Sequence, residues 1–213
     1  MPPQAANPLG KLFGLLKRRN VACGMLGVML TFAGAFATFT YLRPFLETRT
    51  QVTLAQLSLL LLGLGMAGFV GTYGATTCVR RHLYLLIGGL PVALGVVTLC
   101  LLALQHSLWA VGLTLIAWGM LNSAIPISWS TWLTKAISDE PDSGGGLMVA
   151  AIQLSIMLGG AFGGYLLDSV SVGATLIGGS LLLFAAAAVV GVGKRIRPMN
   201  FNLRHRHCCA EGG

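Results

Sequence analysis

The sequence contains long, uninterrupted runs of apolar residues, and these runs limit the folds that the chain can adopt. Examples are residues 57–70 and 83–104. A helix needs about 20 predominantly apolar residues to cross a hydrocarbon core about 30 Å thick. Strands of a membrane barrel are shorter and alternate apolar with polar residues, which these runs do not do. The runs therefore predict membrane-spanning helices.

The composition supports the same prediction. Hydrophobic residues make up 55% of the chain and charged residues 9%, whereas a soluble domain contains about 25% charged residues. The mean hydropathy is +0.78. So few charges cannot cover a globular surface, and the chain needs lipid as its solvent, where helices satisfy their own backbone groups. The 29 glycines favour close packing between these helices.

We predict an all-α membrane protein with six transmembrane helices. The expected spans are residues 20–42, 54–76, 83–104, 108–130, 147–168 and 172–193. Residues 1–19 form a polar lead whose basic part, from Lys11 to Arg19, suits an amphipathic helix on the membrane surface. Residues 194–213 form a basic tail.

Lysine and arginine are distributed unequally between the two sides of this arrangement. Only Arg43 and Arg49, in the first loop, lie on one side. The other 12 of the 14 basic residues lie in the lead, in two loops and in the tail: Lys11, Lys17, Arg18, Arg19, Arg80, Arg81, Lys135, Lys194, Arg195, Arg197, Arg204 and Arg206. Positive charge accumulates on the cytoplasmic side, so both termini are expected in the cytoplasm and the chain in the cell inner (plasma) membrane. The net charge of +8 is thus a feature of topology, and we expect no nucleic-acid partner.

The predicted spans lack the groups that membrane enzymes and proton relays use. No Asp, Glu, Lys, Arg or His lies in the middle of a span. An intramembrane hydrolase would need two carboxylates or a nucleophile with a base, and ion pathways usually contain charged residues. We therefore predict that the chain is not an enzyme and that it has no proton carrier of its own.

The tail contains the one cluster of soft metal ligands, the segment from His205 to Cys209. His205, His207, Cys208 and Cys209 could bind a metal, but nothing in the pattern holds them in a fixed geometry. We favour a cluster without a metal and expect no cofactor.

Uncharged polar and aromatic residues remain at membrane depth. They include Asn122, Gln153, Thr38 and Trp118. A buried amide needs a hydrogen-bond partner, which is either another helix or a polar solute in a cavity, and the sequence leaves both interpretations open for Asn122 and Gln153. Aromatic rings beside amides suit an uncharged, ring-shaped solute.

Glycines mark a predicted helix contact in the fifth span. Gly159 and Gly163 are spaced four residues apart, as are Gly160 and Gly164. Residues at this spacing share a helix face, and glycine lets another backbone approach closely. The pattern predicts a tight contact with a neighbouring helix.

Other local features predict bends, belts and loops. Pro91 and Pro126 lie inside spans, where we expect packing bends. Trp129 and Trp132 are predicted to belong to the aromatic belt at the membrane surface. Residues 138–146 are acidic and glycine-rich, which is typical of a solvated connector.

Several stretches resemble parts of a known family. They are residues 39–46, residues 71–74 followed by Arg80 and Arg81, residues 129–132, and residues 159–164. They are similar to helix seven, the glycine/basic loop motif, helix ten and helix eleven in the C-terminal half of major facilitator superfamily transporters. The subgroup is the drug:proton antiporter branch that includes purine-ribonucleoside and sugar efflux pumps. Ala75 stands where the loop motif has an acidic residue. The resemblance covers about residues 11–193.

The resemblance implies that the chain is one six-helix half of a twelve-helix fold whose solute site lies between the halves. The expected partner is a missing N-terminal half, with a second copy of this chain as the alternative, and we favour a truncated or split piece of a longer transporter. The family's proton-coupling residues lie in that N-terminal half.

The implied activity is proton-coupled efflux of a small polar solute, such as a purine nucleoside or a sugar. Asn122, Gln153 and Thr38 are then expected to face the cavity, with Trp118 as a stacking surface. Gly159, Gly160, Gly163 and Gly164 are expected at the helix interface between the halves. The alternative is a non-transporting remnant or an accessory subunit of a transporter.

Overall fold

The computed structural model describes residues 19–137 and 141–191. All regular structure in these residues is helical. The elements are α2 (Arg19–Thr40), α3 (Leu42–Phe45), the π-helix η1 (Leu46–Thr50), α4 (Leu54–Ala103), α5 (Leu108–Ala136), α6 (Pro141–Ser169) and α7 (Val172–Val190). Five of them are long and apolar enough to cross a membrane, so this is a multi-pass membrane protein. Most of the predicted lead, the whole tail and the His205–Cys209 cluster lie outside the described residues.

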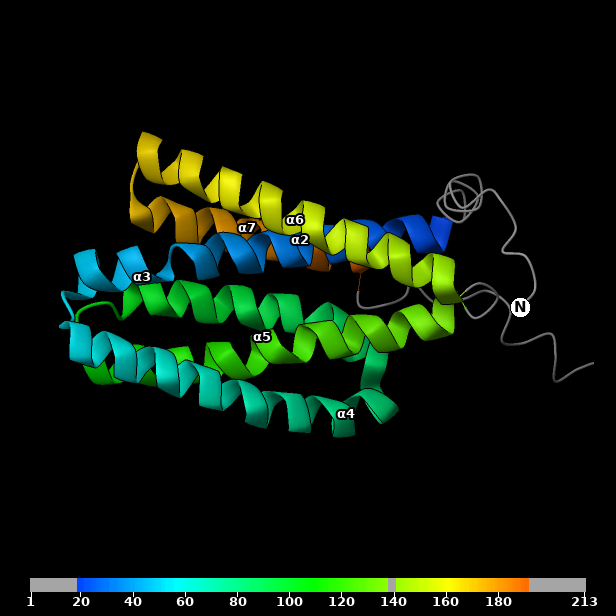
Figure 1. Ribbon diagram of the computed structural model, residues 1–213, viewed down its shortest axis with the longest axis horizontal. Coiled ribbons are helices and arrows are strands. Elements are labelled where there is room, and N and C mark those ends of the chain that lie inside the picture. The colour runs from blue at the N-terminus through cyan, green and yellow to red at the C-terminus, as the bar shows by residue number, and fades with distance from the viewer. Residues whose placement is uncertain (1–18, 138–140, 192–213) are drawn as a thin grey trace, which may run out of the picture.

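The helices form two groups that lie side by side. Helices α2, α6 and α7 pack together, and α4 packs along α5 (Figure 1). Helix α2 contacts both α6 and α7 extensively, whereas α4 joins the groups through its contact with α7. Helix α2 is therefore the central element of its group, and α6 lies at the outside.

Helix α4 is sharply bent at His82, and this bend is called the elbow. Its backbone leaves helical geometry at His82, where φ is −129° and ψ is 35°. Leu57 and Leu101, near its two ends, belong to the same apolar cluster, although a straight helix would separate them by about 66 Å. Its two halves therefore fold back on each other (Figure 1). A loop was predicted around Arg80 and Arg81, but the chain is helical up to this break.

Capping residues set several of the helix ends. The Thr53 hydroxyl accepts from the Gln56 amide at 3.4 Å, and Gln56 Oε1 accepts from the Thr53 amide at 2.9 Å, which forms a capping box before α4. Ser171 accepts from the Ala174 amide at 3.2 Å before α7. Helix α7 ends at Val190, and the capping residue Gly191 has a left-handed φ of 54°, which suits glycine.

Two local predictions are wrong. The connector expected over residues 138–146 is shorter, because α6 begins at Pro141, and proline is well tolerated in a first helical turn. Trp129 and Trp132 do not face lipid in a surface belt. They are 1% and 0% exposed, because Gly27 and Gly24 of α2 leave room for their indoles.

Candidate functional site

Most of the buried hydroxyl groups in the helices donate to a carbonyl of their own helix. Thr38 is fully buried, and its hydroxyl donates to the Gly34 carbonyl at 3.1 Å. It packs against Gly179 of α7, so it lies in the contact between α2 and α7. Ser128 and Ser155 bond to carbonyls one turn earlier in the same way. Thr38 was expected to face a cavity, and the structure places it inside a helix contact.

Trp118 also lies deeper than the sequence suggested. It is 1% exposed, and its indole Nε1 donates to the Thr98 hydroxyl of α4 at 3.1 Å. The ring of Phe39 covers it in a stacked arrangement, with centroids 6.0 Å apart and planes inclined by 12°. Trp118 is therefore a support for an aromatic surface and is not itself that surface.

Phe39 is the aromatic side chain that the structure exposes here. It is 45% exposed, and Phe36, one turn earlier on α2, meets its edge at a centroid distance of 6.3 Å. Phe36, Phe39 and Trp118 thus form an aromatic cluster that is open on the Phe39 side. Sequence reasoning missed Phe39 as a site residue, although the spacing of Phe36 and Phe39 on one span was a signal that could have found it.

Asn122 lies beside this aromatic cluster. It is half-buried and stands one turn after Trp118 on the same side of α5. Within residues 19–137 and 141–191, no hydrogen bond joins its amide to another group. The amide is therefore available to a ligand or to a group that these residues do not include.

Gln153 stands apart from the other predicted site residues. It is an exposed residue of α6, and in the described part of the chain its amide forms no hydrogen bond. No ring contact or hydrogen bond among these residues joins it to Trp118 or Thr38. The structure thus groups Trp118 with Asn122 and leaves Gln153 on a separate helix face.

The four glycines of α6 face different surroundings. A Cβ atom added at Gly159 would lie 2.9 Å from the Ala33 Cα of α2, so Gly159 marks a tight backbone contact. Gly163 packs under the ring of Tyr41. A Cβ added at Gly160 would meet nothing within 4 Å. On the Gly159 side, a close contact therefore joins α6 to α2 of this chain.

Tyr41 completes this contact. Its hydroxyl donates to the Gly160 carbonyl at 2.8 Å and lies next to Gly164. The bond joins the end of α2 to the middle of α6. Its acceptor is a backbone carbonyl within α6. Tyr41 thus fixes α6 on α2 while the outer side of Gly160 stays open.

Comparison with known proteins gives a consistent set of relatives. The chain is 34% identical over 200 residues to proteins named purine ribonucleoside efflux pump NepI from Salmonella enteritidis PT4, Salmonella gallinarum and Salmonella paratyphi B. These names describe transporters rather than enzymes. No protein-family model matches the chain.

The extent of the similarity differs between the chain and these relatives. It covers 94% of the chain but 50% of each pump. The chain therefore spans about half the length of the curated relatives that it matches, and almost all of its described helices lie within the similar region.

Proposed function

We propose that this chain forms one six-helix half of an efflux transporter with the major facilitator fold. The observation that carries the proposal is the similarity to efflux pumps across 94% of the chain and half of each pump. A half of this fold contains six helices. The two arms of α4, residues 54–81 and 83–103, each reach the length of about 20 residues that one crossing needs, which gives six crossings.

The aromatic cluster and the free amides support a site for a small polar solute. Phe39 offers an exposed ring backed by Trp118, and a planar base can stack on such a ring. Asn122 offers both donors and an acceptor to the edge of the base. A purine ribonucleoside, which the names of the relatives specify, has this combination of a planar ring and polar edges.

The rest of the proposed transporter is a second six-helix unit. In α6 the most apolar segment is only 17% buried, and the exposed face contains the amide of Gln153. The partner unit is an N-terminal half in the same protein or a second copy of this chain, and it covers this face. It also supplies the groups for proton coupling, because no described residue in the middle of a membrane crossing carries a charge.

The orientation follows from the basic residues. Arg80 and Arg81 at the elbow and Lys135 at the end of α5 lie at one end of the bundle. Positive charge favours the cytoplasmic side, so the proposal places this end and both termini in the cytoplasm. The membrane is the cell inner membrane.

An export assay tests this function. Cells without purine nucleoside efflux are loaded with labelled adenosine, and its release is followed with and without the full protein. The expected result is faster release that stops when a protonophore collapses the proton gradient. Unchanged release of adenosine and of a labelled sugar, at normal expression in the membrane, would leave the remnant or accessory-subunit interpretation.

The intact mass of the protein in its native membrane tests the proposed partner. The chain alone weighs 22.3 kDa, and we expect a species of about twice that mass, as the length of the relatives implies. A species at the mass of the single chain that forms dimers supports the second-copy arrangement. A monomer of single-chain mass that still exports the solute contradicts the need for a partner.

A further inference from the structure

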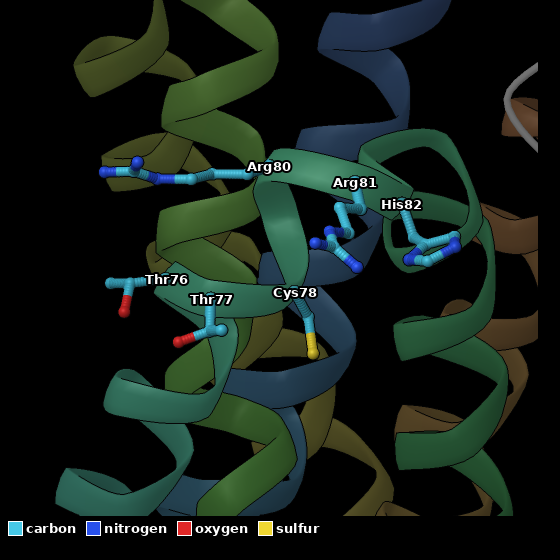
Figure 2. A pocket seen from close by; sticks show the side chains of 6 residues that line it. All are labelled: Thr76, Thr77, Cys78, Arg80, Arg81 and His82. Carbon is cyan, nitrogen blue, oxygen red and sulfur yellow. The ribbon is translucent and has the colours of Figure 1, made fainter.

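The elbow of α4 contains a pocket that the proposed solute site does not use. Its volume is about 690 Å³, and it is lined by Thr76, Thr77, Cys78, Arg80, Arg81 and His82. All six residues come from the last turns before the break in α4 (Figure 2). The pocket therefore exists because the helix stops and reverses at His82.

The basic side chains of this pocket extend to two sides. Arg81 and His82 point to the same side of the turn, above Cys78, whereas Arg80 extends away from them beside the two threonines (Figure 2). All three are exposed. Arg81 and His82 together can therefore reach a small group held in the angle of the elbow, and Arg80 adds positive charge at its rim.

Two acidic residues, Glu47 of η1 and Asp168 near the end of α6, lie far from this pocket. Glu47 already pairs with Arg43 at 2.8 Å, and α4 runs about 40 Å from its start near η1 to the elbow. Val172, just after α6, shares an apolar cluster with Phe45, so Asp168 lies at that same distant end. No ion pair involves Arg80 or Arg81 in the part of the chain that the structure describes.

The threonines of the pocket shape it but do not donate to a ligand. The hydroxyls of Thr76 and Thr77 both donate to the Tyr73 carbonyl, at 2.7 and 3.3 Å. The donors that remain free are the guanidinium and imidazole groups. A pocket with strong donors and positive charge selects an anion rich in acceptor oxygens, and the guanidinium fork matches a phosphate group.

We propose that this pocket binds a phosphate group, which Arg81 and His82 contact and Arg80 attracts. Both arms of α4 are long and apolar enough to cross the membrane, so the elbow lies at the membrane surface. At that depth the phosphate belongs either to an anionic lipid headgroup or to a free phosphate in water. The site does not depend on the transport activity of the protein.

A binding experiment separates these two sources. The full protein in detergent is titrated with phosphatidylglycerol, with phosphatidylcholine and with inorganic phosphate. Bound lipid is counted by native mass spectrometry, and bound phosphate is measured by calorimetry at constant ionic strength. A preference for phosphatidylglycerol over phosphatidylcholine indicates a lipid site, and binding of inorganic phosphate indicates a site for the free anion.

Substitutions show whether the pocket itself is responsible. Arg81→Gln is expected to weaken binding of the preferred ligand by about tenfold or more, as loss of a charge-assisted hydrogen bond requires. Arg81→Lys is expected to restore part of it, because the charge remains and the fork is lost. Lys135→Gln is the matched control: it removes one exposed charge from the same end of the bundle, outside the pocket, and is expected to change the affinity less than threefold.

Two results would overturn the proposal. One is equal loss of binding in Arg81→Gln and Lys135→Gln, which would show that the elbow contributes only general positive charge. The other is undetectable binding of every ligand by wild-type protein. Folding is checked by size-exclusion chromatography, because Arg81 is exposed and its replacement should leave the bundle intact.

Discussion

Helices α2 and α6 are almost equally apolar, yet the protein covers them very differently. The most apolar segments have mean hydropathies of 1.8 in α2 and 1.7 in α6, but 61% of that segment is buried in α2 and only 17% in α6. Helix α2 packs between α6 and α7, and its glycines admit Trp129, Trp132 and the backbone of α7. Helix α6 packs closely along one side only.

The difference shows that the hydropathy of a helix predicts whether the helix can cross the membrane. It does not predict how much of the helix is buried in the protein. Lipid tails are as apolar as leucine, so no hydrophobic force requires the outer side of α6 to be covered. Many exposed residues of α6 are large and apolar, such as Leu154 and Met157, and Gln153 is an exposed polar residue among them. Gln153 is exposed on this side, and a Cβ atom added at Gly160 would meet nothing within 4 Å.

The largest expected effect comes from a substitution that adds an atom to the close contact between α2 and α6. In Gly159→Ala the new methyl group would meet the backbone of Ala33, 2.9 Å from its Cα and 3.0 Å from its carbonyl carbon. Neither helix backbone can yield easily, so we expect a loss of about 1–3 kcal/mol. Unfolding in a denaturing detergent, followed by fluorescence of the buried tryptophans, measures the change. Wild-type stability in this variant would refute the tight α2–α6 contact.

The exposed aromatic residue of α2 gives the next effect. Phe39→Ala removes the exposed ring of the aromatic cluster and leaves Trp118 without its cover. If a purine stacks there, apparent solute affinity should fall about fivefold to a hundredfold, because stacking of a base on an aromatic ring contributes about 1–3 kcal/mol. The concentration dependence of export measures it. Phe39→Trp keeps a stacking surface and is expected to retain export, so equal loss in both variants would argue against stacking.

The exposed amide of α6 gives a smaller effect. Gln153→Ala is expected to weaken solute export about twofold to tenfold, since a neutral hydrogen bond contributes about 0.5–1.5 kcal/mol. Leu154→Ala, at the next exposed position of α6, is the control and should export normally. Unchanged export by Gln153→Ala at normal expression would remove Gln153 from the site.

The smallest effect is expected on the open side of α6. A methyl group in Gly160→Ala meets no atom within 4 Å, and alanine favours a helix over glycine by about 1 kcal/mol. Stability should therefore stay the same or rise slightly in the detergent unfolding experiment. A loss as large as that of Gly159→Ala would show that both sides of α6 are equally packed and would end the comparison between them.

The sequence predicted the helices better than their connections. Long apolar runs indicated where helices lie, because the need for about 20 apolar residues per crossing is set by the bilayer. The polar residues Arg80, Arg81 and His82 indicated an interruption, but a loop was expected where the structure has an elbow within continuous helix. The acidic residues near Pro141 also indicated a loop, although helical geometry begins at that proline.

The sequence predicted that the candidate site residues lie at membrane depth. It did not predict whether their side chains face a cavity or the interior of the protein. Thr38 and Trp118 were candidates because they are polar or aromatic at membrane depth. In the structure both side chains are buried inside the protein. A threonine can satisfy its hydroxyl on the carbonyl one turn earlier, so its presence in a span does not indicate a cavity. Phe39 became a candidate only when the structure showed it exposed over Trp118.

By itself the sequence determined that this is a membrane protein, that it is helical and which ends of the helices carry positive charge. These properties depend on local composition and on the thickness of the bilayer. Only the tertiary structure decided which face of each helix is covered, that Gly159 packs while Gly160 stays open, and that three basic residues are among those that line a pocket at the elbow. Those outcomes depend on which helices become neighbours, and in lipid that choice is made by shape and hydrogen bonds rather than by hydrophobicity.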